Sequence, residues 1–103
     1  MVQLIVLFPQ PVDVTQFESD YVRHLELLHD KANIPSDAIP YSVTKFLPAN
    51  DAVPPFYQMF TMPFESPEAL DAVMASLGMQ EVAAHANRIS TGGPITILVG
   101  SQD

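Results

Sequence analysis

The chain has 103 residues and no cysteine, with four Lys or Arg against twelve Asp or Glu, so its formal charge at pH 7 is −8. A chain of this length forms one domain, residues 1–103, and can bury a core of its own, while the lack of cysteine excludes disulfides and thiolate chemistry. The negative charge repels phosphate backbones and anionic lipid heads, so we expect no nucleic-acid partner and no membrane partner.

Residues 2–8 predict a first strand, because their side chains alternate between two faces. Both faces are apolar, which is typical of a central strand covered on two sides. A chain this short has little left to cover the second side, and its apolar content of 48% is high. We therefore expect a second copy of the chain to cover it.

The apolar stretch has no basic flank and ends at Pro9, too early for a signal core or a membrane span, so we expect a soluble, cytoplasmic protein.

Residues 13–32 predict a long amphipathic helix. Asp13 has the chemistry of an N-cap, and Val12 and Phe17 are then placed as a hydrophobic staple. Thr15 and Glu18 form an alternative capping box, so the first residue of the helix stays open. At 100° per residue, the core-facing stripe consists of Phe17, Tyr21, His24, Leu25, Leu28 and Ala32.

The middle of the chain predicts two strands joined by a proline-rich loop. Residues 33–40 form a loop by composition, and residues 41–47 are rich in β-branched and aromatic side chains, as strands are. Three prolines follow in residues 48–56, and residues 56–62 predict the next strand.

The C-terminal part predicts two helical segments and a last strand. Ser66 is placed as an N-cap before Pro67, and Gly78 is a natural helix end. The buried residues of this helix are expected to be Leu70, Val73, Met74 and Leu77. A shorter helical segment covers residues 79–89, a turn covers 91–94 and an apolar strand covers 95–99. The order βαββαβ indicates an α+β, ferredoxin-like domain, a four-stranded antiparallel sheet with helices on one face.

Several short motifs resemble the EthD family of dimeric α+β barrel proteins. They are the opening LIVLFPQP, the spacing Phe17-x-x-x-Tyr21-x-x-His24, and Gly92-Gly93-Pro94 before an apolar strand. The resemblance covers nearly the whole chain. It implies a homodimer joined through sheet faces, with a small pocket between helix and sheet in each subunit.

The resemblance also implies a range of activities. The family is named for a small protein linked to the degradation of ethyl tert-butyl ether. Related barrels include cofactor-free monooxygenases, lactone isomerases, and cyclases, dehydratases and decarboxylases that process polyketides. Two positions depart from the family pattern: Glu26 replaces a proline that commonly follows the histidine, and His85 stands where an aspartate is common. The second departure puts a family-wide acid–base scheme in doubt.

His24 is the main catalytic candidate, because an imidazole that faces the core can move a proton on or off a bound carbonyl or phenol. The alternative is a core histidine that is hydrogen-bonded to backbone. Asp20, four residues earlier, is expected to pair with the imidazole and favour its charged form. Tyr21 is expected to orient the ligand, although packing alone also explains a tyrosine there. The residues expected to bind the ligand are Phe17, Leu28, Tyr57, Met59, Phe60 and Met74.

Other chemistries are not supported. His24 and His29 diverge by about 140° around a helix, so they do not form a metal site, and His29 is expected to be solvated. Gly92-Gly93 is explained by a turn, because no Lys or Ser follows as in a phosphate-binding loop. We expect neither metal nor cofactor.

Three hypotheses remain. The first is a cofactor-free oxidoreductase, isomerase or lyase that acts on a small apolar, aromatic or polyketide-like molecule, with His24 as proton shuttle. The second is a non-catalytic binding or accessory protein of a degradation pathway. The third is an interaction module without a small-molecule site.

Overall fold

The computed structural model describes residues 1–101, so the last two residues of the predicted domain lie outside the described part. The elements follow the expected order, including the two helical segments before the last strand. Their bounds are β1 (Val2–Pro9), α1 (Val14–Lys31), β2 (Ser42–Lys45), β3 (Phe56–Phe64), α2 (Pro67–Met74), α3 (Leu77–Ile89) and β4 (Thr96–Ser101).

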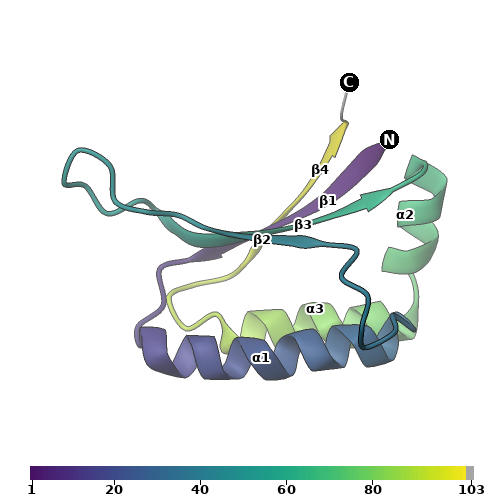
Figure 1. Ribbon diagram of the computed structural model, residues 1–103, viewed down its shortest axis with the longest axis horizontal. Helices are drawn as coiled ribbons and strands as arrows, with labels where there is room; N and C mark the ends of the chain where they lie inside the picture. Colours follow the sequence, from purple (N-terminus) through teal and green to yellow (C-terminus); the bar gives the residue numbers. More distant parts are fainter. Residues whose placement is uncertain (102–103) are drawn as a thin grey trace.

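The four strands form one antiparallel sheet in the order β2-β3-β1-β4. Figure 1 shows α1 and α3 side by side beneath the sheet, with α2 at one end and no helix on the opposite face. The predicted α+β, ferredoxin-like architecture with helices on one face is confirmed. The two central strands are the apolar β1 and β3, as the two-sided pattern of β1 predicts.

The register of β1 and β3 defines the helix-facing side of the sheet. Leu4 pairs with Met62, Val6 with Phe60, and Phe8 with Gln58. These side chains pack against α1 and α3, and they supply the sheet's part of the core. The register shifts between Phe8 and Pro9, where Tyr57 is the extra residue. Such a bulge re-aims a side chain, and Tyr57 consequently packs against Phe17 of α1, with ring centroids 5.5 Å apart.

Helix α1 begins as its capping chemistry predicts. The side chain of Asp13 accepts a hydrogen bond from the backbone N–H of Gln16 at 3.1 Å, so Asp13 is the N-cap and the Thr15 alternative is excluded. Phe17, Tyr21, His24 and Leu28 are buried, which confirms the stripe. The hydrophobic staple is wrong, because Val12 is 82% exposed and does not cover Phe17.

The division between α2 and α3 corrects the expected role of Gly78. Helix α2 ends at Met74, and Ser76 caps a new helix by accepting from the N–H of Met79 at 3.2 Å. Gly78 therefore lies in the first turn of α3, where a Cβ would stand 3.0 Å from the carbonyl oxygen of Lys31. Leu77, expected to be buried, is 78% exposed, because the new helix begins at this residue and turns it outward.

The connections around the sheet vary in how tightly they are held. Strand β2 is shorter than predicted and exposed, and the hairpin loop after it extends beyond the sheet (Figure 1). The turn before β4 is closely packed, since a Cβ on Gly92 would lie 1.8 Å from the carbonyl oxygen of Gln10. Only glycine allows this approach of the turn to the end of β1.

Candidate functional site

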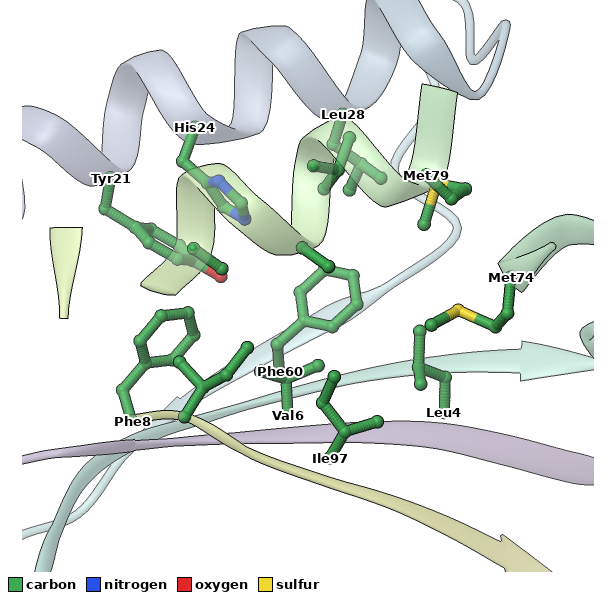
Figure 2. A pocket seen from close by; sticks show the side chains of 14 residues that line it. Leu4, Val6, Phe8, Tyr21, His24, Leu28, Phe60, Met74, Met79 and Ile97 are labelled. Atoms are coloured by element: carbon green, nitrogen blue, oxygen red, sulfur yellow. The ribbon is translucent and has the colours of Figure 1, made fainter. Parts of the chain in front are cut away.

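A small apolar cavity lies between the sheet and the two long helices. Figure 2 shows Tyr21, His24 and Leu28 extending from α1 towards Phe8, Phe60 and Val6 on the strands, with Met74 and Met79 at one end. The remaining lining residues are Leu4, Val82, Ala83, Ala86, Ile95 and Ile97. Helical spacing along α1 and alternation along β1 and β3 bring these side chains to one place.

His24 is the one ionisable imidazole in the lining, and its side chain is 6% exposed. Its Nδ1 lies 2.9 Å from Nδ1 of His85, which α3 supplies. Nε2 is left without a hydrogen-bond partner among residues 1–101. Burial lowers the pKa of His24 to about 4, and the neighbouring His85 adds to this effect. The ring is therefore neutral at physiological pH, which is the form that accepts a proton.

Tyr21 stands one turn before His24, and its hydroxyl is buried without a hydrogen-bond partner in the described chain. Burial raises the pKa of this phenol, so it stays protonated and is a hydrogen-bond donor. The Nε2 of Gln58, on β3, is also buried and unpartnered. The Gln58 side chain also acts on the pKa of Tyr21, so the two groups lie close together, and a ligand or water oxygen that accepts from both would offset the cost of burying them.

A polar cluster continues from Gln58 to the surface. Oε1 of Gln58 accepts from Lys45 Nζ at 2.5 Å, and Lys45 also donates to Glu18 at 2.6 Å. Tyr57 donates to the same carboxylate, and this hydrogen bond raises the pKa of Tyr57 to about 12. Burial acts to raise the pKa of Glu18, but the two donors outweigh it and the pKa is lowered. Lys45 lies 4.9 Å from the centre of the Tyr57 ring. The cluster fixes the Gln58 amide with its N–H groups towards the core.

The structure brings together most of the residues that the sequence indicated. His24, Tyr21, Leu28, Phe60 and Met74 line the cavity. Phe17 and Tyr57 lie in the adjoining aromatic cluster and do not reach it. Placing Met59 in this pocket is wrong, since Met59 pairs with Leu7 on the helix-free face of the sheet. This placement follows from strand alternation, because Phe60 and Gln58 on either side of Met59 face the helices.

The surroundings of His24 and His29 in the structure differ from those expected. Asp20 does not pair with His24: it accepts from Gln16 at 2.9 Å and lies 3.7 Å from Arg23. The i,i+4 spacing placed Asp20 near the ring, but the ring turns towards α3. His29 is half-buried and not free in solvent, because Tyr41 and the carbonyl of Pro35 bond its two ring nitrogens at 2.7 and 3.1 Å.

The spacing of residues in the sequence did not place His85, Gln58 or Lys45 in the site. His85 is 61 positions from His24, and no spacing rule connects two separate helices. Gln58 carried a signal, since it is the one polar residue on the apolar face of the predicted strand. No group of three His, Cys, Asp or Glu side chains that could hold a metal ion occurs within residues 1–101.

The size of the cavity limits what it admits as it stands. Its volume is about 40 Å³, room for roughly three water molecules. A larger hollow of about 490 Å³ lies at the C-terminal end of α1, between β3 and α2. Lys31 is its only charged lining residue, and neither histidine of the pair contributes. The smaller cavity has the convergent polar groups that mark a reactive site.

No family model matches the chain, and no curated protein matches it. Several solved structures share its fold. One is an ethyl tert-butyl ether D (EthD) family protein from Bacillus halodurans C-125, 24% identical with a TM-score of 0.83, over 100% of this chain and 99% of that one. Another is a dimeric ferredoxin-like protein of unknown function from Jannaschia sp. CCS1, 12% identical with a TM-score of 0.70, over 99% and 100% of the two chains.

An antibiotic biosynthesis monooxygenase also shares the fold, at 16% identity and a TM-score of 0.57, over 100% of this chain and 99% of that one. Together these structures confirm the resemblance to EthD-type and dimeric ferredoxin-like proteins at the level of the fold. Among the described residues, no helix is both long and apolar enough to cross a membrane.

Proposed function

We propose that the chain is a cofactor-free protein of EthD type that binds a small apolar molecule between α1 and the sheet and moves a proton with His24. The class of molecule is an aromatic or polyketide-like compound with an acidic C–H or O–H. The observation that carries the proposal is a neutral, buried imidazole in an apolar cavity, with Nε2 left free of protein partners.

The division of roles follows from the protonation states. A neutral His24 accepts a proton from the bound compound at Nε2 and returns it to another atom of the compound or passes a proton on. Tyr21 donates its hydroxyl to the oxygen on which negative charge develops. The apolar lining excludes water, which strengthens both interactions. Proton removal of this kind can begin an isomerisation, an elimination or a cofactor-free oxygenation, so the proposal fits each of these reaction types.

Entry of a compound larger than a few water molecules requires part of the lining to move. Met74 and Met79 lie at one end of the cavity, and methionine is the apolar side chain that repacks most easily (Figure 2). Met74 ends the short helix α2, which Figure 1 shows at the end of the molecule, apart from the two long helices. We propose that this end is where the pocket enlarges.

The proposal also covers the oligomeric state of the protein, its pathway and its location in the cell. The neighbour from Jannaschia is described as dimeric, and the helix-free face of the sheet presents Ile5, Leu7, Met59 and Leu98. We propose a homodimer joined through these faces. A role in the degradation of ethyl tert-butyl ether or a similar compound, and a cytoplasmic location, remain predictions.

Deuterium exchange tests the proposal without a known substrate. The protein is incubated in D₂O with a panel of small apolar ketones and phenols, and loss of exchangeable C–H signals is followed by proton NMR. We expect exchange above the buffer rate for at least one compound, and a loss of roughly 10²- to 10⁴-fold in His24→Gln.

Glu26→Gln, on the exposed side of α1 and outside both the cavity and the histidine pair, is the matched control and should exchange like the wild type. Compounds that bind near His24 without exchange in either protein would instead indicate the non-catalytic binding protein. Equal exchange in wild type and His24→Gln contradicts the proposed role of the histidine.

A further inference from the structure

The contact between His24 and His85 links the cavity to the outer surface of the helix layer. The two rings are nearly parallel and meet at their edges, with centroids 5.2 Å apart, planes 8° from parallel, and Nδ1 atoms 2.9 Å apart. His24 is buried and lines the cavity, whereas His85 is half-buried. His85 lines a surface hollow between α1 and α3 together with Arg23, Leu27, Glu81, Ala84 and Arg88.

A contact this short between two ring nitrogens fixes the number of protons between them. One Nδ1 must carry a hydrogen and the other must accept it, since two bare nitrogens repel and two N–H groups collide. The pair therefore has two neutral arrangements. In the first, His24 carries its proton on Nδ1, so its Nε2 is bare and can act as a base. In the second, His85 donates, and His24 carries its proton on Nε2, where it can act as an acid.

No carboxylate of the described residues forms a hydrogen bond or ion pair with either ring. On α1, Asp20 pairs with Arg23 at 3.7 Å and accepts from Gln16. On α3, Glu81 lies 3.2 Å from Lys31. The remaining charged groups beside His85 are the guanidinium groups of Arg23 and Arg88, which cannot accept a proton. The exit for a proton from His85 is therefore solvent.

We propose that His85 is a relay residue that carries protons between His24 and solvent, so that the cavity never retains a buried imidazolium. This inference rests on the proposed function of His24. When Nε2 of His24 takes a proton from the compound, the Nδ1 proton of His24 passes to Nδ1 of His85. His85 then loses its Nε2 proton to water. One proton enters and one leaves, and His24 ends neutral with its proton on the cavity side.

Nitrogen NMR of the histidine rings tests the relay directly. At neutral pH we expect His24 to be in the Nδ1–H form, with a scalar coupling between the two Nδ1 atoms across the hydrogen bond. In His85→Phe, which keeps an aromatic ring but has no nitrogen, the coupling should disappear and His24 should change to the Nε2–H form. Nε2–H on both wild-type rings, or an unchanged His24 spectrum in His85→Phe, would overturn the proposal.

A second variant separates proton transfer from positioning. His85→Gln can accept the Nδ1–H of His24 through its amide oxygen but cannot pass a proton on. In the deuterium-exchange assay we expect both His85→Phe and His85→Gln to lose roughly 10- to 100-fold, and the pH profile of the remaining activity to shift.

Wild-type exchange in His85→Gln would overturn the relay and leave the role of His24 intact. Failure of the proposed function gives a different result, because then no variant and no wild-type protein shows exchange. The NMR result still tests the shared proton in that case, since it needs no substrate.

Discussion

At the scale of the residue, the site depends on a titratable group that the fold keeps uncharged. His24 is buried in a mainly apolar lining, and its only hydrogen-bond partner in residues 1–101 is another imidazole. Burial makes a lasting charge on this ring costly, but the neutral ring has a bare nitrogen that can accept a proton from a bound compound. This follows from the stripe of α1, so the sequence indicated which residue faces the core. The sequence did not indicate its partner, because the meeting of α1 and α3 is a tertiary contact.

Burial of His24 predicts that acid destabilises the protein. In the unfolded chain the imidazole takes up a proton below about pH 6.5, whereas in the folded chain its pKa is lowered to about 4. The unfolded state therefore binds more protons between these values, and stability is lost as the pH falls from 6.5 to 4. We expect this contribution to be on the order of 3 kcal/mol at most. Denaturant unfolding at several pH values measures it.

The variant His24→Gln serves as the control for this slope. It cannot titrate, so its stability should depend less on pH across the same window. The same slope in both proteins would show that other groups cause the loss.

Removing the hydroxyl of Tyr21, which has no hydrogen-bond partner in the described chain, should not lower the stability of the protein, whereas removing the hydroxyl of Tyr41 should lower it. Tyr21→Phe removes a buried polar group that has no hydrogen bond, so stability should be unchanged or rise by about 1 kcal/mol, while ligand binding weakens. Tyr41→Phe removes a bond to His29 and should cost about 1 kcal/mol. Thermal unfolding compares the two. A clear loss of stability in Tyr21→Phe would indicate a structural role for its hydroxyl.

At the scale of the element, local sequence chemistry predicted the existence of each helix and strand but not every boundary. Ser66 and Ser76 both cap helices, and only Ser66 was expected to do so. Gly78 was expected to end a helix, because glycine often occupies that position. Its actual place depends on the carbonyl of Lys31, which belongs to another helix. Likewise, the bulge at Tyr57 could not be read from alternation, because it arises from the pairing of β1 with β3.

The start of α1 gives a prediction at this scale. Asp13→Ala removes the acceptor for the N–H of Gln16 and should lower the free energy of unfolding by about 1 kcal/mol. Thr15→Ala lies in the first turn of the same helix without a capping role, and it should change stability by less than about half of that. Chemical denaturation of the two variants compares them. A larger effect at Thr15 would place the cap two residues later.

At the scale of the whole molecule, the helices of residues 1–101 cover only one of the two faces of the sheet (Figure 1). The helices cover one face, and the other presents the side chains of Ile5, Leu7, Met59 and Leu98 to whatever lies outside. The apolar alternation of residues 2–8 predicted a sheet that needs covering on both sides. Apolar side chains on an uncovered face are what the proposed homodimer would bury.

The proposed dimer is tested by a charge on that face. Leu7→Lys should make the protein monomeric in sedimentation experiments, because the ammonium group would be buried against apolar side chains of the second copy. Val22→Lys, on the exposed side of α1, is the control and should remain dimeric. A wild-type monomer, or a Leu7→Lys dimer, would contradict an interface through the sheet.

The most direct test of the account is a crystal structure of the protein purified from its native host, inspected for a bound molecule beside His24. The account predicts a small, largely apolar compound between α1 and the sheet, with one atom within hydrogen-bond distance of Nε2 of His24 and an oxygen near the Tyr21 hydroxyl. Nε2 bonded to the protein's own backbone, or a compound bound only in the hollow beside Lys31 and α2, would contradict it.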